Sequence, residues 1–177
     1  MSMTPQEIAQ LRSWSPEQMA RRVVRFATLA WSSQALLDAT LPGCGAALAP
    51  VIGLGITQDR DHEAPVANAH GFSLEWLRIP PGGRMSRHTL QQKQVLVVYR
   101  GSVGIDVQGI DGTVRSVAHG GDAGWDSFAM PADCWRSLHN TGDQDAVVLL
   151  MTPGDHRKHI RWAPEVLEAA AAQGRSE

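Results

Sequence analysis

The feature that most constrains the fold is a series of short apolar runs between residues 72 and 152, separated by glycine and proline. The run 103–107 alternates apolar with other residues and leads into Gly109-Ile110-Asp111-Gly112, which predicts a β-hairpin. The runs 94–99 and 146–151 are almost wholly apolar and rich in valine or leucine. Short strands spaced by turn signals predict a mainly β fold, an antiparallel sandwich or barrel.

The residues before and after these runs predict helices. Ser15-Pro16-Glu17-Gln18 has the pattern of a helix start, with a serine cap and a proline at the first helical position. Apolar residues then recur at helical spacing, so we expect a helix from about 16 to 30 and a second one around 33–39. Pro164-Glu165, followed by an alanine-rich segment, predicts a short C-terminal helix.

The length of 177 residues, with 43% hydrophobic and 19% charged residues, fits one ordinary globular domain with extensions. We expect three parts, which are an N-terminal helical extension over 1–45, a β-barrel over 46–155 and a tail with a short helix over 156–177.

Composition also limits the partners and the compartment. With 16 basic and 18 acidic residues the net charge is −2, which argues against nucleic-acid binding. The longest apolar stretch, 46–56, is interrupted by proline and glycine and is shorter than the roughly 20 residues of a membrane-spanning helix. No basic segment leads into an apolar one at the N-terminus, as a secretory signal requires, so the sequence predicts a cytoplasmic protein without a membrane partner.

Two spacing patterns lie inside the strand-rich region. The first runs Gly82, five residues, His88-Thr89-Leu90, three residues, Gln94, six residues, Gly101, and the second runs Pro131-Ala132-Asp133, two residues, Arg136, three residues, Asn140. They resemble the two motifs of the cupins, a superfamily of small jelly-roll β-barrels. The resemblance covers about residues 72–152, although the glycine expected shortly before Pro131 is displaced. It implies a single cupin-like jelly-roll barrel.

The resemblance also implies where a metal would bind. In cupins two histidines, a glutamate and a third histidine hold one divalent metal inside the barrel. This sequence keeps His88 but has Leu90, Gln94 and Arg136 at the other three positions. Leucine cannot ligate, an amide oxygen is a weak neutral donor, and a guanidinium is permanently charged and offers no acceptor. The sequence therefore predicts no metal site and no cofactor.

The same four positions are expected to face the barrel interior, where a guanidinium is costly unless an anion pairs with it. We expect Arg136 to bind a carboxylate, phosphate or enolate of a small organic ligand, with Gln94 adding a hydrogen bond and Leu90 lining the site. His88 would orient the ligand or transfer a proton, which makes it the candidate catalytic residue. In the opposing interpretation Arg136 has no ligand and only fills the barrel cavity. Its side chain then either turns to the barrel mouth or pairs with an acidic residue of the protein. The candidate acids are Asp126, Glu75 and Asp133.

Three functions remain open from the sequence. The first, and the one favoured here, is binding of a small anionic molecule without catalysis. The second is a metal-independent isomerase, epimerase, cyclase or lyase that uses His88 on an anionic substrate. The third is a metal-dependent dioxygenase-type cupin whose ligands come from other positions. Since the family often pairs its barrels and an amphipathic N-terminal helix would suit an interface, the resemblance also predicts a homodimer.

Overall fold

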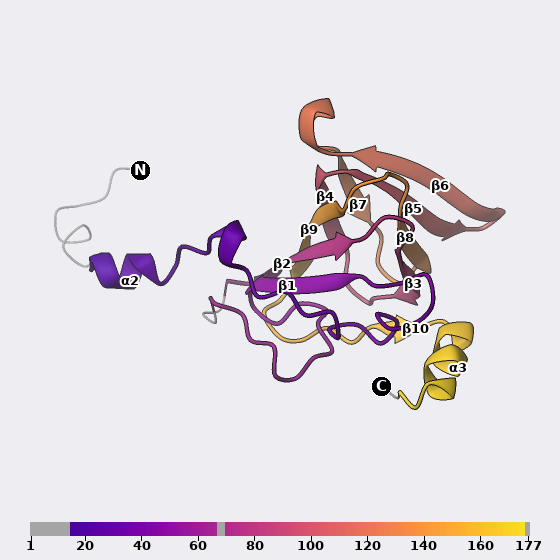
Figure 1. Cartoon of the computed structure of the whole chain (residues 1–177), viewed down its shortest axis with the longest axis horizontal. Helices are drawn as coiled ribbons and strands as arrows, with labels where there is room; N and C mark the ends of the chain where they lie inside the picture. The colour runs from indigo at the N-terminus through magenta and orange to yellow at the C-terminus, as the bar shows by residue number, and fades with distance from the viewer. Residues whose placement is uncertain (1–14, 67–69, 176–177) are drawn as a thin grey trace, which may run out of the picture.

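The computed structural model describes residues 15–66 and 70–175, and over these ranges the chain forms two sheets of five strands each (Figure 1). The first sheet has the order β1 (Ala47–Ile52), β2 (Phe72–Ile79), β9 (Ala146–Pro153), β4 (Gln94–Arg100) and β7 (Ser127–Met130). The second has the order β10 (Arg161–Trp162), β3 (Arg84–Thr89), β8 (Arg136–Asn140), β5 (Ser102–Gly109) and β6 (Gly112–His119). Neighbouring strands in both sheets pair antiparallel, so the prediction of a mainly β jelly roll is confirmed.

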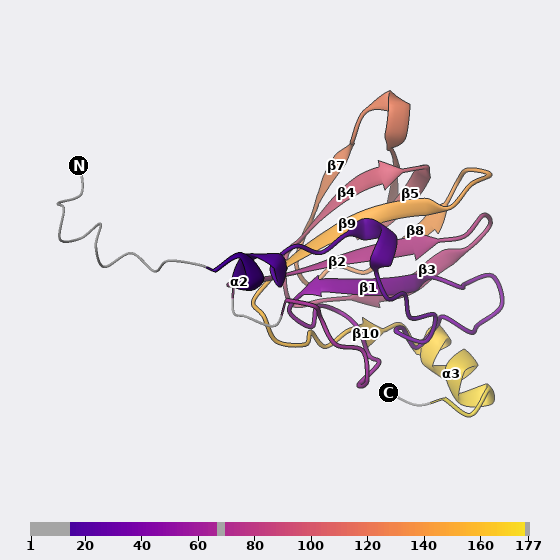
Figure 2. The ribbon, with the colours of Figure 1, turned by 60° about the vertical axis from the view of Figure 1, so that its left-hand side comes forward.

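The two sheets face each other across an apolar core (Figure 2). Leu77 and Leu96 of the first sheet and Ile105 and Leu138 of the second are at most 2% exposed. Each belongs to an alternating strand, so their neighbours in sequence point to the outer faces. Since the apolar side chains fill the middle of the barrel, any polar group on an inward position is cut off from water.

The backbone shows the predicted hairpin and explains why the first motif ends in a glycine. Strands β5 and β6 pair along their whole length and close with Gly109 opposite Gly112, as the turn sequence predicted. At the start of β5, Gly101 has φ +81°. A Cβ atom there would lie 2.9 Å from the Cα of Ala146, so the close approach of β9 requires glycine at this position.

The N-terminal helices differ from the prediction. The capping box is confirmed, because the Ser15 side chain accepts from the backbone N–H of Gln18 and the Gln18 side chain accepts from that of Ser15. The helix α2 (Pro16–Ala20), however, ends after five residues, so the predicted helix over 16–30 is wrong beyond Ala20. No residue of α2 is buried, so no packed face extends the helix.

The chain after α2 follows the outer face of the first sheet instead. A short 3₁₀ turn, η1 (Phe26–Thr28), places the Phe26 ring 5.1 Å from that of Trp76 and 5.6 Å from that of Tyr99. The segment 33–39 forms turns rather than the predicted second helix. Its backbone bonds to distant residues, since Leu37 N–H donates to Gln58 Oε1 at 2.8 Å. Tertiary contacts therefore override the local helical spacing in both segments.

The C-terminal helix is confirmed as α3 (Pro164–Ala172), and it buries Val166 and Ala170 at helical spacing. Just before it, β10 pairs with β3, with Trp162 opposite His88, and so adds an edge strand to the second sheet. Another 3₁₀ turn, η2 (Gly121–Ala123), links β6 to β7. No helix within 15–66 and 70–175 has the length and apolar character to cross a bilayer.

Candidate functional site

His88 and Arg136 lie directly opposite each other on the paired strands β3 and β8. Both side chains are 1% exposed, and both occupy inward positions of the second sheet. Opposed residues on antiparallel strands have Cβ atoms about 5 Å apart, so the two side chains are neighbours within the barrel. The structure thus brings together two of the three polar residues that the cupin spacing singled out, His88 and Arg136.

The Arg136 guanidinium is only partly satisfied by the protein. Its Nη1 donates to the carbonyl oxygen of Pro131 at 3.0 Å, whereas the buried Nε and Nη2 have no hydrogen-bond partner in the described part of the chain. No carboxylate pairs with Arg136 within 15–66 and 70–175, so Asp126, Glu75 and Asp133 do not neutralise it. At 1% exposed it does not reach the barrel mouth either. Burial lowers the pKa of this guanidinium.

His88 is held as a neutral imidazole with a fixed orientation. Its Nδ1 lies 2.7 Å from the carbonyl oxygen of Ser86, and its ring centroid lies 5.5 Å from that of Trp162. Because a carbonyl only accepts, Nδ1 carries the proton and Nε2 presents a lone pair. Burial, and next the positive charge of Arg136, lower the pKa of His88 to about 3.

Gln94 and Leu90 also point into the barrel but contribute differently. Gln94 is 3% exposed and donates from Nε2 to the Thr152 hydroxyl at 3.0 Å, which leaves Oε1 as an acceptor. Leu90 is 1% exposed, and its carbonyl accepts from the backbone N–H of Asp133 at 2.8 Å. No hydrogen bond joins Gln94 to His88 or Arg136 among the described residues.

These residues do not fit the divalent metal that the cupin resemblance implies. Of the four positions, only His88 supplies an ordinary metal ligand, and its neighbour Arg136 repels a cation. Across 15–66 and 70–175, no group of three or more histidine, cysteine, aspartate or glutamate side chains is placed to hold a metal ion.

A second buried ionisable pair, Glu75 and Lys158, was not singled out by the sequence patterns. Glu75 is 1% exposed, and its Oε1 and Oε2 accept from Ile56 N–H at 2.9 and 3.1 Å. Burial raises the pKa of Glu75 to about 8, although the nearby Lys158 opposes that shift. Lys158 is 2% exposed and donates from Nζ to the His156 carbonyl at 2.7 Å. Glu75 shares the buried face of β2 with Leu77, and the alternation in the sequence marked the two faces of this strand without marking which one is buried.

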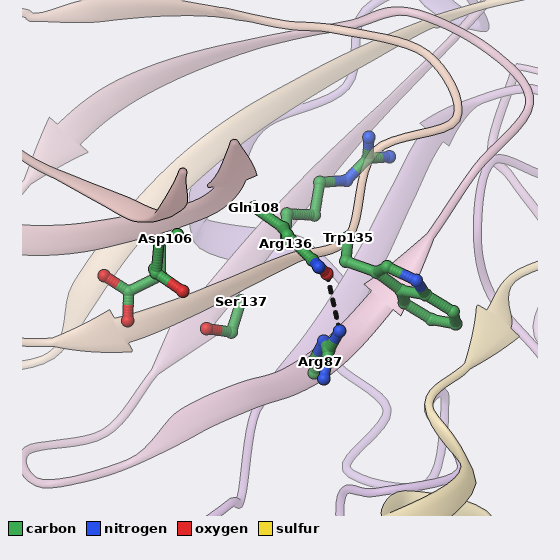
Figure 3. A pocket seen from close by; sticks show the side chains of 8 residues that line it. Arg87, Asp106, Gln108, Trp135, Arg136 and Ser137 are labelled. Atoms are coloured by element: carbon green, nitrogen blue, oxygen red, sulfur yellow. Dashed lines mark hydrogen bonds between the residues drawn. The ribbon is translucent and has the colours of Figure 1, made fainter. Parts of the chain in front are cut away.

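One cavity lies on the outer face of the second sheet, not in the barrel (Figure 3). It has a volume of about 280 Å³, and its lining includes Asp106, Gln108 and Trp135. Figure 3 shows the Arg136 guanidinium directed away from Arg87 and Asp106, although Arg136 contributes to the wall. Four cavities over the described residues, this one included, have no lining by His88, Leu90 or Gln94.

The outer cavity is lined by polar side chains, and its charged groups form hydrogen bonds with one another or with neighbouring residues. Arg87 donates to Gln108 Oε1 at 2.5 Å, and its guanidinium lies 5.2 Å from the centre of the Trp135 ring. On the adjoining strands Arg115 forms two hydrogen bonds with Asp106 at 2.7 and 2.8 Å. The charged groups here have protein partners, in contrast to Arg136 on the inner face of the same sheet.

Solved structures resemble this arrangement, whereas no family model and no curated protein sequence matches the chain. An oxalate oxidase shares 20% identity over 72% of this chain, with a TM-score of 0.55. The oxalate decarboxylase of Lactobacillus farciminis, solved as a formate complex, shares 14% identity over 85% of this chain, with a TM-score of 0.57. The chain has a cupin fold.

The similarity is one of architecture. The chain spans 59% of the oxalate oxidase and 38% of the oxalate decarboxylase chain. At these identities the cupin fold is shared, and the chemistry of the barrel must be argued from the residues present in this chain.

Proposed function

We propose that the cupin barrel binds a small organic anion through Arg136, without the usual divalent metal. The observation that carries this proposal is the buried guanidinium whose Nε and Nη2 have no partner in the described part of the chain. A buried charge without a counter-ion is strongly unfavourable, and a bound anion would compensate it. The neighbouring N–H groups of Nε and Nη2 lie on one edge of the guanidinium, where they match the two oxygens of a carboxylate.

The other predicted residues have supporting roles in this proposal. His88 offers Nε2 as an acceptor for a donor group of the ligand, Gln94 keeps the second N–H of its amide as a donor, and the buried Leu90 keeps water from the ion pair. The solved neighbours named for oxalate act, by those names, on a molecule with carboxylate groups. That agrees with a carboxylate as the anion.

Binding is favoured over catalysis by the state of His88. A general base works best when the pKa of its conjugate acid lies near the working pH. With the pKa of His88 lowered to about 3, the imidazole is a weak base in the free protein. The alternative of a metal-independent isomerase, epimerase or lyase therefore needs the ligand to raise that pKa, which neutralising Arg136 would promote.

A thermal-shift titration with sodium acetate, propanoate, lactate and phosphate tests the proposal. At least one anion should raise the melting temperature, and at tenfold excess over its Kd it should add about 1.4 kcal/mol to the free energy of unfolding. Arg136→Met should abolish the shift, and Arg136→Lys should weaken it, because lysine keeps the charge but not the two-pronged edge.

Arg87→Met is the matched control, since Arg87 lines the outer cavity of Figure 3. It should leave the anion effect unchanged. Anion stabilisation that disappears in Arg87→Met and persists in Arg136→Met would move the site to the outer face and end the proposal.

A further inference from the structure

The charges around Arg136 limit the charge of its ligand. Arg136 supplies one positive charge, and its neighbour His88 is neutral. No ion pair reaches Arg136 from any described residue, so the protein itself leaves a single uncompensated charge at this position. A ligand with one negative charge makes the buried site neutral. A dianion leaves one negative charge without a partner, and a zwitterion leaves the positive charge uncompensated.

The hydrogen-bonding pattern adds a second constraint. The Arg136 Nε and Nη2 groups lack an acceptor among the described residues. His88 Nε2 can accept a hydrogen bond, because Nδ1 carries the proton and is engaged with the Ser86 carbonyl. The two groups lie on directly opposed residues, so one small molecule can meet both. Its acceptor and its donor must therefore stand on neighbouring atoms.

We propose that the site selects a small 2-hydroxycarboxylate, with its carboxylate on Arg136 Nε and Nη2 and its hydroxyl donating to His88 Nε2. This inference rests on the proposed anion site and names the class of ligand. The hydroxyl is neutral at physiological pH, so it satisfies His88 without adding charge. The carboxylate supplies the single negative charge that Arg136 lacks.

Related anions fail at one of these two points. Propanoate neutralises Arg136 but leaves His88 Nε2 without a donor. Oxalate brings a second negative charge next to the lone pair of Nε2 and no hydroxyl. Alanine has a donor, but its ammonium group places a second positive charge beside Arg136. A site built to bond a ligand hydroxyl discriminates strongly against the analogue that lacks it.

Isothermal titration calorimetry of the wild-type chain at pH 7 with lactate, propanoate, oxalate and alanine tests this selection. We expect lactate to bind about tenfold more tightly than propanoate, the effect of one well-made buried hydrogen bond, and oxalate and alanine to bind more weakly than propanoate. His88→Leu should reduce the ratio between lactate and propanoate to about one while propanoate still binds. The comparison of ligands on the unmodified chain stands even if this variant does not fold.

The outcomes separate this inference from the proposed function. Equal affinities for lactate and propanoate, or tighter binding of oxalate, would overturn the hydroxycarboxylate and leave the anion site standing. Failure of all four compounds to bind, or binding that survives Arg136→Met, would overturn the anion site and this inference with it.

Discussion

Two of the buried ionisable sites in the described part of the chain, at Glu75 and at Arg136, are completed in opposite ways. At Glu75 the backbone N–H of Ile56 bonds the carboxyl group, and the Lys158 ammonium lies near enough to affect its pKa. At Arg136 one carbonyl accepts from Nη1, and the other two nitrogens have no partner among the described residues. Both Glu75 and Arg136 are 1% exposed, so burial does not distinguish them.

The difference indicates which site is structural. Glu75 accepts from the backbone of Ile56 and Lys158 donates to the backbone of His156, so both groups have hydrogen-bond partners within the chain. Arg136 keeps two N–H-bearing nitrogens, Nε and Nη2, without a partner in the described part of the chain, as the proposed anion site requires. A buried charge alone is therefore a weak sign of function, whereas a buried charge with free donors is a stronger one.

The largest expected effect tests the Glu75 site through pH. Its folded pKa, about 8, lies above the ordinary value of 4.5, so the folded state holds a proton that the unfolded state loses over this range. The free energy of unfolding should fall as pH rises from 4.5 to 8, by about 1.4 kcal/mol per pH unit from this group. Glu75→Gln should remove that slope in urea unfolding. A Glu75→Gln profile parallel to wild type would contradict the raised pKa.

His88 should produce the opposite slope. Its folded pKa, about 3, lies below the ordinary value of 6.5, so between these values the unfolded state binds the proton. The contribution of His88 to the free energy of unfolding therefore falls as pH decreases from 6.5 towards 3. His88→Gln should remove this part of the pH dependence. Between pH 4.5 and 6.5 the slopes from Glu75 and His88 oppose each other. Urea unfolding of wild type and His88→Gln at half-unit pH intervals checks this prediction. If the two proteins have the same pH dependence below pH 6.5, His88 takes up its proton in the folded state as readily as in the unfolded state.

The next effect tests how tightly the Glu75 site is closed. Gly55 has φ +52°, and a Cβ atom there would overlap the Glu75 carboxylate. Gly55→Ala should lower the free energy of unfolding by about 3 kcal/mol, from backbone strain and overpacking together. Gly71→Ala is the matched control, because Gly71 has φ +76° but open space around the added atom. Equal losses in the two variants would show that only backbone strain acts.

The smallest effect concerns Arg136 in the absence of ligand. Replacing a buried, poorly paired charge by an apolar side chain of similar length is often neutral or stabilising. Arg136→Met should therefore raise the free energy of unfolding by about 1 kcal/mol in chemical denaturation. A loss of several kcal/mol would instead favour the opposing interpretation, in which Arg136 fills the barrel cavity and holds the barrel together.

Much of the fold was predictable because strands and hairpins leave local signals. The turn at 109–112 and the alternating runs predicted β5, β6 and the neighbouring strands. The helix over 16–30 was not, because its continuation depended on a surface to pack against, and Phe26 packs on Trp76 and Tyr99 instead. Helical spacing alone carries no information about such a surface.

The candidate site was predictable in part for the same reason. Motif spacing placed His88 and Arg136, which the register of β3 and β8 then brings together. The interior position of Glu75 was missed, because alternation along β2 shows two faces without showing which one is buried. Its partner Lys158 is 83 residues away in sequence and reaches it only through the fold. The homodimer and the cytoplasmic location remain predictions from the sequence.

The most direct test of the central claim observes the Arg136 side chain itself. In a ¹⁵N–¹H correlation spectrum of the arginine Nε–H groups, the Arg136 signal is assigned by its loss in Arg136→Met. Lactate should shift this signal and slow its exchange with water, while the Arg87 signal stays in place. An Arg136 Nε–H signal that does not change while lactate binds would contradict the account.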